Sequence, residues 1–593
     1  HWLLLRAELA FCRGEFDTAA ANARNAIEAV QGPARLPFVY RLAEIELYRG
    51  MFPEARRLIA SAIQSLQADE DVNQVCRWSN LLGEIEFFSG NVEAAKEQFE
   101  QARQQLDQLL DGQRDSVVRA NILQNVALVA EALGDWSAAR AAHQSALEIR
   151  RQTGDARGAV CSLHGMGKAY LGLRDLEQAE RLLSEAARAA GQLAEGLLLA
   201  KVTHSRADLA SALSDYAEAE RLAREALEAF RRYSTPYDIA AALLTLSRLR
   251  GLQGDLTGRM TAIDQARQLI DPGQFLILYR LFPEAAMPPP ARVRAGVLAY
   301  AAGDALGVPW EGRPGSEIAW EAIGQLPARH GWPAGSTSDD TAQLLLVAEY
   351  LSELGAVADE REFLSRLTAA FPEMRGAGPS TTAAVQRFRA TGELLAAGGE
   401  TNGAAMRALP IGWAVPVAAS KRRRELTIRL SRTTHGSVGA IGSACLVAAM
   451  ASWTIEACPL GAIISAAVDE IDWLEGLFPG SRGVFQPVRD AASGAWTPSG
   501  AQVTMDAVTT LAAVIHVLRH VERKGLELTD ALRYAVSLGG DTDTVTAIVG
   551  GILGCRKEDV AELPWLSRVV LPDSAMLDVV STALSRLRRS FYG

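Results

Sequence analysis

The chain has 593 residues, of which 49% are hydrophobic and 22% are charged. One hydrophobic core rarely organises more than roughly 250–300 residues, so we expect several domains. The formal net charge of -10 argues against non-specific binding to nucleic acid, and no apolar run is long enough to cross a membrane.

The cysteines and the first residues give two further expectations. The six cysteines contain no CxxC pair, which favours a reducing, cytoplasmic compartment over disulfides or a zinc site. The chain begins with His1 and with an apolar stretch typical of the middle of a helix, so we expect a fragment of a longer protein.

A turn signature recurs through the first 270 residues. A glycine is followed by a residue that is polar except at Met51, then by an aromatic or apolar residue and, three positions after that, by an alanine. The signature begins at Gly14, Gly50, Gly90 and Gly134, and in weaker form at Arg174, Ser214 and Gly254. Helical patterns flank each turn, and the last three turns are forty residues apart. The pattern predicts two-helix repeats in which the first residue of the signature ends the first helix.

These repeats resemble tetratricopeptide repeats, whose common period is about 34 residues. The longer period is similar to the variant in kinesin light chains and in bacterial regulators of the maltose-activator type. The resemblance implies a helical solenoid of about seven repeats over residues 1–270, with a concave face that binds a protein or peptide partner. The alternative is a spacer without a partner.

Prolines mark the end of the repeats. Asp271-Pro272-Gly273, Pro283 and the triproline run Pro288-Pro289-Pro290 follow in close succession. Such a composition is typical of a stiff linker, so we expect a linker over residues 271–290. The apolar stretch Phe275–Phe282 within it is a candidate capping helix of the solenoid.

Residues 291–593 show helical periodicity and no alternating strand pattern. The clearest predicted helices include Thr341–Leu354 and Thr544–Leu553. The fold class expected for the whole chain is therefore all-α, a repeat solenoid followed by a helical domain.

Two acidic clusters stand directly before these two helices. They are Ser338-Asp339-Asp340-Thr341 and Gly539-Gly540-Asp541-Thr542-Asp543-Thr544. Neighbouring carboxylates repel one another unless a cation neutralises them, and Mg²⁺ and Mn²⁺ prefer oxygen ligands. Two separate clusters suit a centre of two metal ions about 3.5–4 Å apart. The alternative is that both clusters serve only as helix caps.

Three further motifs accompany the clusters in chain order. They are Gly303-Asp304 with Glu311, Thr401-Asn402-Gly403 with Met406-Arg407, and Thr434-His435. Together the five motifs resemble the ADP-ribosylglycohydrolase family over roughly half the chain. The resemblance implies an orthogonal all-α domain over residues 291–593, with its site in a cleft at helix ends. It also implies two Mg²⁺ or Mn²⁺ ions and hydrolysis of an N- or O-glycosidic bond at C1″ of ADP-ribose.

The resemblance assigns roles to individual residues. The metal ligands would be Ser338, Asp339, Asp340, Asp541, Asp543 and Thr544. Ser338 departs from the family, where a threonine is usual, but it keeps the hydroxyl. The catalytic residues would be Glu311, Asp339 and Asp340, with the choice of general base left open between Glu311 and Asp340. Asp304 would be a structural cap or would support a ligand.

The nucleotide would be held by loops. Gly376, Gly378 and Ser380 form a glycine-rich stretch before a helix, which could cradle a diphosphate or be a plain loop. Asn402, Gly403, Met406, Arg407 and His435 complete the expected substrate residues. Arg407 could instead be a buried structural cation, and a lone histidine such as His435 is more often structural. The pair His516 and His520 indicates a surface face, because no third metal ligand is visible.

The function we expect is removal of ADP-ribose from a modified target, chiefly a protein, by a hydrolase whose repeats recruit partner or substrate. Two alternatives stay open. One is a degenerate domain that binds ADP-ribose or serves as a scaffold. The other is a hydrolase of ADP-ribosylated nucleic acid or of small molecules.

Overall fold

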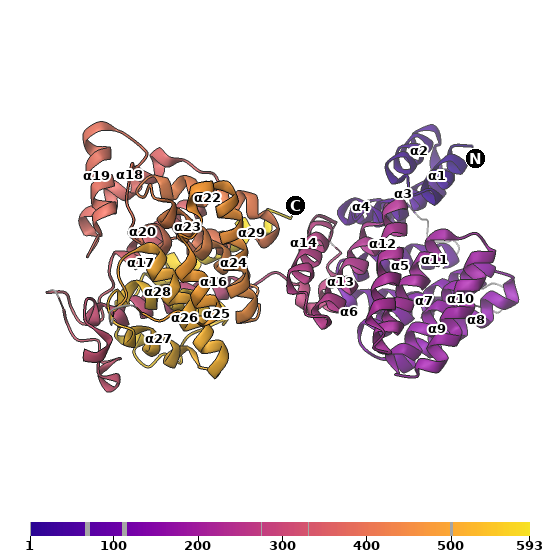
Figure 1. Ribbon diagram of the computed structural model, residues 1–593. Helices are drawn as coiled ribbons and strands as arrows, with labels where there is room; N and C mark the ends of the chain where they lie inside the picture. Colours follow the sequence, from indigo (N-terminus) through magenta and orange to yellow (C-terminus); the bar gives the residue numbers. More distant parts are fainter. Residues whose placement is uncertain are drawn as a thin grey trace. The chain divides into compact units, whose positions relative to one another are not determined.

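The computed structural model describes residues 2–65, 72–109, 115–273, 275–329, 331–498 and 502–592. These residues form α-helices and short 3-10 turns, with isolated β-bridges in place of strands, so the all-α prediction is confirmed. The chain divides into two compact units, His1–Ala286 with Tyr592–Gly593, and Met287–Phe591 (Figure 1). We call the first the repeat unit and the second, after the family that its sequence motifs resemble, the hydrolase unit. None of the described helices has the length and apolarity that a membrane span requires.

The described part of the repeat unit forms seven helical hairpins. Their helices are α1 (Trp2–Cys12), α2 (Phe16–Ala29), α3 (Leu36–Tyr48), α4 (Phe52–Ser65), α5 (Val72–Phe88), α6 (Val92–Asp107), α7 (Ser116–Ala132), α8 (Trp136–Thr153), α9 (Ala156–Gly172), α10 (Leu176–Gln192), α11 (Gly196–Ala212), α12 (Tyr216–Arg232), α13 (Pro236–Leu252) and α14 (Leu256–Gly273). Each turn signature of the sequence lies between the two helices of one hairpin, as predicted.

The signature residues have separate tasks in each turn. The first residue is in the left-handed region, with φ of 78° at Gly134 and 64° at Ser214. In the last four turns the residue that follows is an aspartate whose side chain caps the second helix; the Asp135 carboxylate, for example, accepts a hydrogen bond from Ala138 N at 2.9 Å. The alanine is fully buried at the crossing of the two helices, as at Ala139. The turn signature recurs because the turn needs a left-handed residue, the second helix needs a cap, and the helix crossing needs a small side chain.

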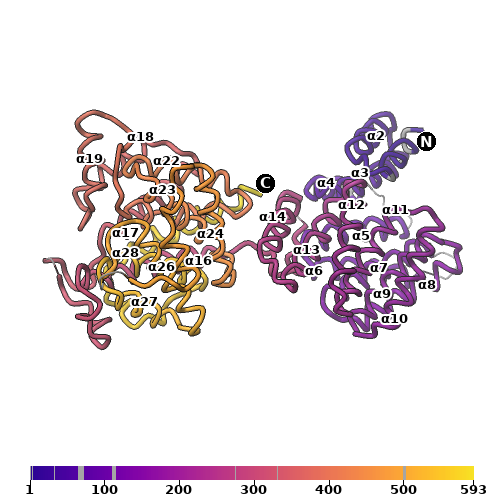
Figure 2. The backbone as a smooth tube through the Cα atoms, viewed as in Figure 1, coloured from indigo at the N-terminus to yellow at the C-terminus, as the bar shows by residue number. Residues whose placement is uncertain are grey.

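The first and last hairpins of the repeat unit meet. The backbone at Gly14 packs on the backbone at Tyr233, so that a Cβ at position 14 would lie 2.3 Å from the Tyr233 carbonyl oxygen. Gly50 packs in the same way on Gly273, with 2.5 Å from a Cβ to the carbonyl oxygen. The backbone can be followed in Figure 2 through these turns, of which the one between α3 and α4 contacts the end of α14 and the one between α1 and α2 contacts the residue after α12. The solenoid therefore closes on itself.

Aromatic side chains reinforce this closure. The rings of Phe52 and Phe275 lie edge to face with centroids 5.5 Å apart, and those of Phe88 and Tyr237 with centroids 4.9 Å apart. Aromatic pairs of this kind contribute about 0.5–1.5 kcal/mol beyond the area they bury. We call the contacts of Gly14, Gly50, Phe52 and Phe88 with the last hairpins the closure seam.

Most of the expected linker, residues 271–286, belongs to the repeat unit, so the predicted linker was too long. Residues 271–286 contain the end of α14, helix α15 (Ile277–Leu281) and a 3-10 turn at Pro283–Ala285. The buried Arg267 guanidinium donates hydrogen bonds of 2.8 Å to the carbonyls of Ala285 and Ala286, which holds the stretch in place. Helix α15 occupies the stretch in which a capping helix was expected. Pro290 begins the next helix, because a proline is tolerated where no N–H is needed.

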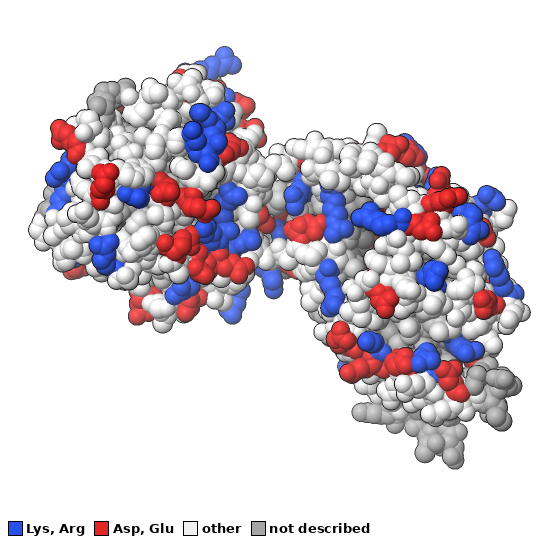
Figure 3. Space-filling model, turned by 90° about the horizontal axis from the view of Figure 1, so that it is seen from below, with Lys and Arg blue, Asp and Glu red and all other residues white. Residues whose placement is uncertain are grey.

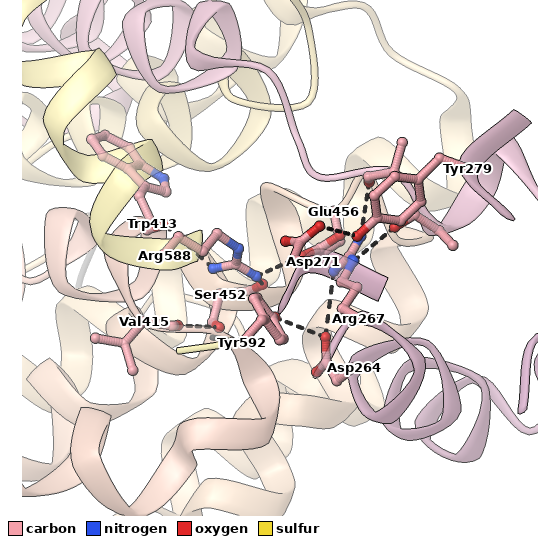
Figure 4. Close-up of polar contacts among 12 residues, drawn as sticks. Asp264, Arg267, Asp271, Tyr279, Trp413, Val415, Ser452, Glu456, Arg588 and Tyr592 are labelled. Atoms are coloured by element: carbon pink, nitrogen blue, oxygen red, sulfur yellow. Dashed lines mark hydrogen bonds and ion pairs between the residues drawn. The ribbon is translucent and has the colours of Figure 1, made fainter. Parts of the chain in front are cut away.

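Asp264 and Arg267 also hold the C-terminal Tyr592, which belongs to the repeat unit. The Tyr592 hydroxyl donates to Asp264 Oδ1 at 2.9 Å, and its ring lies 5.8 Å from the Arg267 guanidinium (Figure 4). Asp264 and Arg267 form a fully buried ion pair at 3.3 Å. The pairing supplies each buried charge with a partner.

The hydrolase unit consists of further helices joined by longer loops. They are α16 (Pro290–Gly307), α17 (Asp339–Leu354), α18 (Glu360–Ala370), α19 (Pro379–Thr391), α20 (Gly403–Met406), α21 (Leu409–Ala414), α22 (Ser420–Arg432), α23 (Val438–Thr454), α24 (Leu460–Leu477), α25 (Gln486–Ser493), α26 (Ala507–Lys524), α27 (Leu528–Ser537), α28 (Thr542–Gly554) and α29 (Ser574–Arg589). The predicted helices 341–354 and 544–553 are α17 and α28.

Helices α16 and α28 cross at the centre of this unit, and both are almost entirely buried. Small residues let the two backbones approach closely. A Cβ at Gly303 would lie 2.5 Å from the Thr546 carbonyl oxygen, and one at Gly307 would lie 2.4 Å from Asp543 Cα. The crossing brings the end of α16 against the acidic start of α28.

Arg588 anchors the last helix of the hydrolase unit (Figure 4). Its side chain is 2% exposed and forms an ion pair with Glu456 at 2.6 Å. It also donates to the carbonyls of Gly412, Trp413 and Ser452, at the ends of α21 and α23. A single cation thereby satisfies carbonyls that the two helices leave free.

On the face drawn in Figure 3, acidic and basic side chains are interspersed over both units. In the repeat unit, charged side chains also pair along one helix, such as Arg221 with Glu218 and Arg224 with Glu220. This face therefore lacks the continuous basic stripe that is typical of nucleic-acid-binding proteins.

Candidate functional site

Both acidic clusters lie at the N-terminus of a helix of the hydrolase unit. Ser338 is the N-cap of α17, and its hydroxyl accepts a hydrogen bond from Asp340 N at 3.2 Å. Asp541 is the N-cap of α28, but its side chain makes no capping hydrogen bond. Helix N-termini favour negative charge. The capping hypothesis is therefore correct for Ser338 and does not account for Asp541.

Asp304 holds the start of α17 against α16. Its carboxylate is fully buried and accepts hydrogen bonds from Ser338 N at 3.0 Å, Thr341 N at 3.1 Å and Thr341 Oγ1 at 2.5 Å. It is thus both a cap and the support of the first cluster, as the sequence had suggested.

The two glycines before Asp541 place the second cluster. Gly539 and Gly540 have φ of 71° and 81°, in the left-handed region that favours glycine. A Cβ at Gly540 would lie 1.9 Å from the Val503 carbonyl oxygen. Gly540 N donates to Arg313 O at 2.8 Å, and Asp541 N to Val503 O at 3.0 Å. No larger residue fits this turn, which is held between two loops.

The pKa values of the aspartates show that the clusters face one another. Burial raises the pKa of Asp340 well above its usual value, and the charges of Asp304, Asp339 and Asp541 add to the effect. Burial, followed by the charges of Asp541 and Asp340, does the same for Asp543. Burial also raises the pKa of Asp339 to about 7 and that of Asp541 to about 6. The negative charges of both clusters therefore share one buried space.

Two carboxylate oxygens in this space lack a partner. Asp340 Oδ2 and Asp543 Oδ1 are buried and accept no hydrogen bond from the described residues. An unpaired buried charge is costly. Hard cations prefer oxygen ligands, so a set of carboxylates and hydroxyls with free oxygens is suited to bind one. Yet no three His, Cys, Asp or Glu side chains of the described residues are arranged to hold a metal ion as they stand.

Glu311 follows the 3-10 turn Val308–Trp310 at the end of α16 and is half-buried. Its charge is among the causes, after burial, that raise the pKa values of Asp541 and Asp543. Its backbone carbonyl accepts a hydrogen bond from Arg329. Glu311 therefore lies on the α28 side of the acidic clusters, at their edge.

The glycine-rich stretch lies on the α17 side. Gly376 has φ of 83°, and a Cβ there would lie 3.7 Å from Asp339 Oδ1. Gly378 is the N-cap of α19, and the hydroxyl of Ser380 in the first turn accepts a hydrogen bond from Thr401 Oγ1 at 2.9 Å. The stretch and the N-terminus of α19 are thus beside the carboxylates.

Asn402 binds the second cluster directly. Its Nδ2 donates to Asp541 Oδ2 and, at 2.9 Å, to Thr510 Oγ1. Gly403 follows at the start of α20, where a Cβ would lie 3.0 Å from the His435 ring. Met406 is buried at the end of that helix. Asn402 therefore supports a carboxylate as well as standing in the expected substrate loop.

Arg407 and His435 lie behind this loop. Arg407 is 3% exposed and donates to Gln343 Oε1 at 2.7 Å and to Thr434 Oγ1 at 2.6 Å. His435 is fully buried, with Nδ1 2.7 Å from Thr434 Oγ1 and Nε2 3.0 Å from Thr401 Oγ1. Burial, followed by the charge of Arg407, lowers the pKa of His435 to about 3, so the ring is neutral.

Sequence reasoning missed three contributors to this site: Gln343, Thr510 and Val503. Gln343 follows Asp339 by four residues on one helix, a spacing that places the two side chains on one face and could have indicated the contact. Thr510 and Val503 carry no local signal, because they reach the site through the packing of a distant loop and helix.

Other charged and aromatic features have structural partners. His516 Nε2 is 3.0 Å from the Tyr534 hydroxyl, and His520 stacks on the Tyr534 ring at 4.1 Å, so the two histidines join α26 to α27. In the basic run at 421–424, Arg423 and Arg424 both pair with the buried Glu470.

Comparisons with known proteins agree with this architecture. Residues 287–588 match the family model described as ADP-ribosylglycohydrolase, and residues 118–192 match a tetratricopeptide repeat model. An uncharacterized protein of Archaeoglobus fulgidus is 28% identical over 304 residues, which cover 50% of this chain and 96% of that protein.

Two solved structures are also similar. An ADP-ribosylglycohydrolase-related protein complex is 26% identical with a TM-score of 0.40, covering 50% of this chain and 98% of that chain. A Rap protein complexed with competence and sporulation factor is 17% identical with a TM-score of 0.37, covering 47% and 81%. Since the family match spans half of its length, the chain belongs to the ADP-ribosylglycohydrolase family, with a hydrolase-type unit that follows tetratricopeptide repeats.

Proposed function

We propose that this protein is a metal-dependent hydrolase that removes ADP-ribose from a modified target, chiefly a protein, by cleaving the glycosidic bond at C1″. The observation that carries the proposal is the pair of unpartnered oxygens, Asp340 Oδ2 and Asp543 Oδ1, in a buried space shared by two clusters of aspartates. Helix capping alone requires no such arrangement.

Two Mg²⁺ or Mn²⁺ ions would be held by oxygens from both clusters. The ligands would be Ser338, Asp339 and Asp340 from one side, and Asp541, Asp543 and Thr544 from the other. When bound, the ions would bind vicinal ribose hydroxyls and activate a water. Because the carboxylates are not yet arranged as a complete metal site, binding requires small rotations of these side chains.

The protein's own groups would divide the remaining tasks. Cleavage at C1″ passes through an oxocarbenium-like transition state, which nearby carboxylates stabilise. Glu311 is better suited than Asp340 to act as general base, because it is half-buried at the edge of the site. Asp340 is 3% exposed, and its neighbours favour its protonated form when no cation is bound.

The diphosphate would lie at the N-terminus of α19, where Gly376 and Gly378 leave the backbone accessible. Ser380 presents a hydroxyl in the same place. The neutral His435 supports Thr401 and Thr434 and thereby the shape of the loop.

The repeat unit would recruit the partner or the modified substrate. A cavity of about 430 Å³ opens among α1, α3, α5 and α7 of this unit. Tyr40 provides aromatic surface, and Arg41 and Glu44 provide charges. Such a lining suits an extended peptide, which carries both apolar side chains and backbone amides.

The experiment is the release of ADP-ribose from a panel of ADP-ribosylated proteins, nucleic acids and small molecules, with Mg²⁺, with Mn²⁺ and with EDTA. We expect metal-dependent release that is lost in the double variant Asp541→Ala, Asp543→Ala. Absence of release from every substrate, with ADP-ribose still bound, would instead support an ADP-ribose-binding scaffold. The preferred substrate would identify the linkage.

A further inference from the structure

Gln343 connects the acidic cluster to a buried cation. It lies on α17, one turn after Asp339, and is fully buried. Its Nε2 donates to Asp339 Oδ2 at 2.7 Å, and its Oε1 accepts from Arg407 Nη1 at 2.7 Å. A carboxylate only accepts and a guanidinium only donates, so these two neighbours fix which way the amide of Gln343 points.

Arg407 has no carboxylate of its own. Among the described residues its partners are Gln343, Thr434 and the carbonyl of Leu430, and its guanidinium lies 5.0 Å from the Phe363 ring. Burial lowers its pKa to about 9, against the opposing effect of the Asp339 charge. A buried cation without an ion pair is costly. The nearest compensation is Asp339, on the other side of Gln343.

The contact also determines which oxygen of Asp339 is available. Oδ2 is occupied by Gln343, whereas Oδ1 lies 3.7 Å from the position of a Cβ on Gly376. Oδ1 is therefore the oxygen directed toward the glycine-rich stretch. If the Gln343 amide were absent, the carboxylate could rotate about its side-chain torsion.

We propose that Gln343 is a positioning residue. Its two hydrogen bonds connect Asp339 to the Arg407 guanidinium and hold Asp339 Oδ1 in the direction of the cation site. The inference rests on the proposed metal-dependent function. It also gives Arg407 a task different from the expected contact with substrate, because Arg407 acts through Gln343. Partners that orient metal ligands typically change metal affinity by about 10–100-fold when they are removed.

The test uses two variants of the full chain. Gln343→Glu keeps the size and the acceptor for Arg407 but loses the donor to Asp339, and Gln343→Leu loses both hydrogen bonds. Calorimetric titration with Mn²⁺ should show affinity about 10–100-fold weaker in both variants. Tyr350→Phe is the matched control, because it removes a buried hydroxyl of the same helix that donates to Val357 O at 2.8 Å, away from the clusters.

A purely structural role predicts a different result. In that case the Gln343 variants would resemble Tyr350→Phe, with a lower melting temperature and unchanged Mn²⁺ affinity, and the proposal would be overturned. Circular dichroism identifies variants that fail to fold, and Gln343→Glu is the variant designed to fold when Gln343→Leu does not.

A second measurement does not depend on a metal. In a metal-free crystal structure of Gln343→Glu or Gln343→Leu, the Asp339 carboxylate should be rotated away from its wild-type position. An unchanged Asp339 would contradict the positioning role. If wild type binds no Mn²⁺ but the carboxylate still rotates, the metal part of the proposed function fails and the positioning role stands.

Discussion

The repeat unit and the hydrolase unit use the same short motif, a glycine followed by an aspartate at the start of a helix, in two different ways. At Gly134-Asp135 the exposed carboxylate caps its own helix through Ala138 N. At Gly540-Asp541 the buried carboxylate makes no cap and instead accepts from Asn402 and Thr510. An aspartate that is not used as a cap, and is buried among other carboxylates, indicates a task beyond local stability.

Of the substitutions that test this difference between the two aspartates, Asp541→Asn should have the largest effect, a loss of activity. The amide cannot replace a charged metal ligand, so we expect the rate of ADP-ribose release to fall by more than about 100-fold, beyond the range for partners of ligands. Removal of one negative charge from a repulsive cluster should leave the metal-free protein at least as stable. Activity assays and thermal unfolding with EDTA measure the two effects. A marked loss of stability in Asp541→Asn would favour a structural task.

The second effect concerns pH. Since burial raises the pKa of Asp339 to about 7 and of Asp541 to about 6, above the usual 3.8, the folded state binds more protons than the unfolded state within this window. The stabilisation that these two carboxyl groups contribute to the metal-free hydrolase unit should therefore be complete below about pH 4, and it should be lost as the pH rises through 6 and 7. A bound cation favours the ionised forms, so Mn²⁺ should remove the decline. Thermal unfolding between pH 5 and 8, with Mn²⁺ or EDTA, tests both signs.

If the stability of the metal-free protein instead rose between pH 5 and 8, the two aspartate clusters would not share one buried space. The control is Asp541→Asn, in which one of the raised groups is gone and the decline should be shallower. The two units can unfold separately, so the transition to follow is the one that responds to Mn²⁺.

A third comparison lies within the repeat unit. Gly50 and Gly134 both have positive φ, but Gly50 packs on Gly273 in the closure seam, whereas nothing lies within 4 Å of a Cβ at Gly134. Alanine at either site incurs the left-handed penalty of about 1–2 kcal/mol. Only Gly50→Ala should also loosen the seam. Hydrogen exchange of residues 275–281 in the full chain should accelerate in Gly50→Ala and stay unchanged in Gly134→Ala.

Equal exchange in both variants would mean that the seam is not a stable contact. The same distinction explains why the turn signature weakens along the chain. Arg174 and Ser214 adopt φ of 64° in later turns, so a larger residue is accepted at this position of the turn. The glycines at positions 14 and 50 are required in addition by the close approach of a distant backbone.

Local pattern was sufficient to predict the hairpins, their turns and the starts of α17 and α28, because these follow from capping, left-handed residues and periodicity. It also located the two carboxylate clusters. The closure seam could not be predicted, since it joins residues roughly 150 or more positions apart, by backbone contacts at Gly14 and Gly50 and by ring contacts at Phe52 and Phe88. Neither could the positions of Val503 and Thr510 around Asp541, which depend on how a distant loop packs. The predicted linker was too long because the hydrogen bonds of Arg267 to Ala285 and Ala286, which follow it in the chain, are not local.

The smallest expected effects come from two single substitutions that distinguish a helix cap from a metal ligand. Asp135→Ala and Ser338→Ala each remove a helix cap, and each should lower the stability of its own unit by about 0.5–2 kcal/mol. Only Ser338 is also a proposed metal ligand, so only Ser338→Ala should weaken Mn²⁺ binding, and Ser338→Thr should keep it. Denaturant unfolding and calorimetric titration measure the two properties. If Ser338→Ala binds Mn²⁺ as wild type does, its hydroxyl is a cap like the carboxylate of Asp135, and the first cluster contributes only its carboxylates to the site.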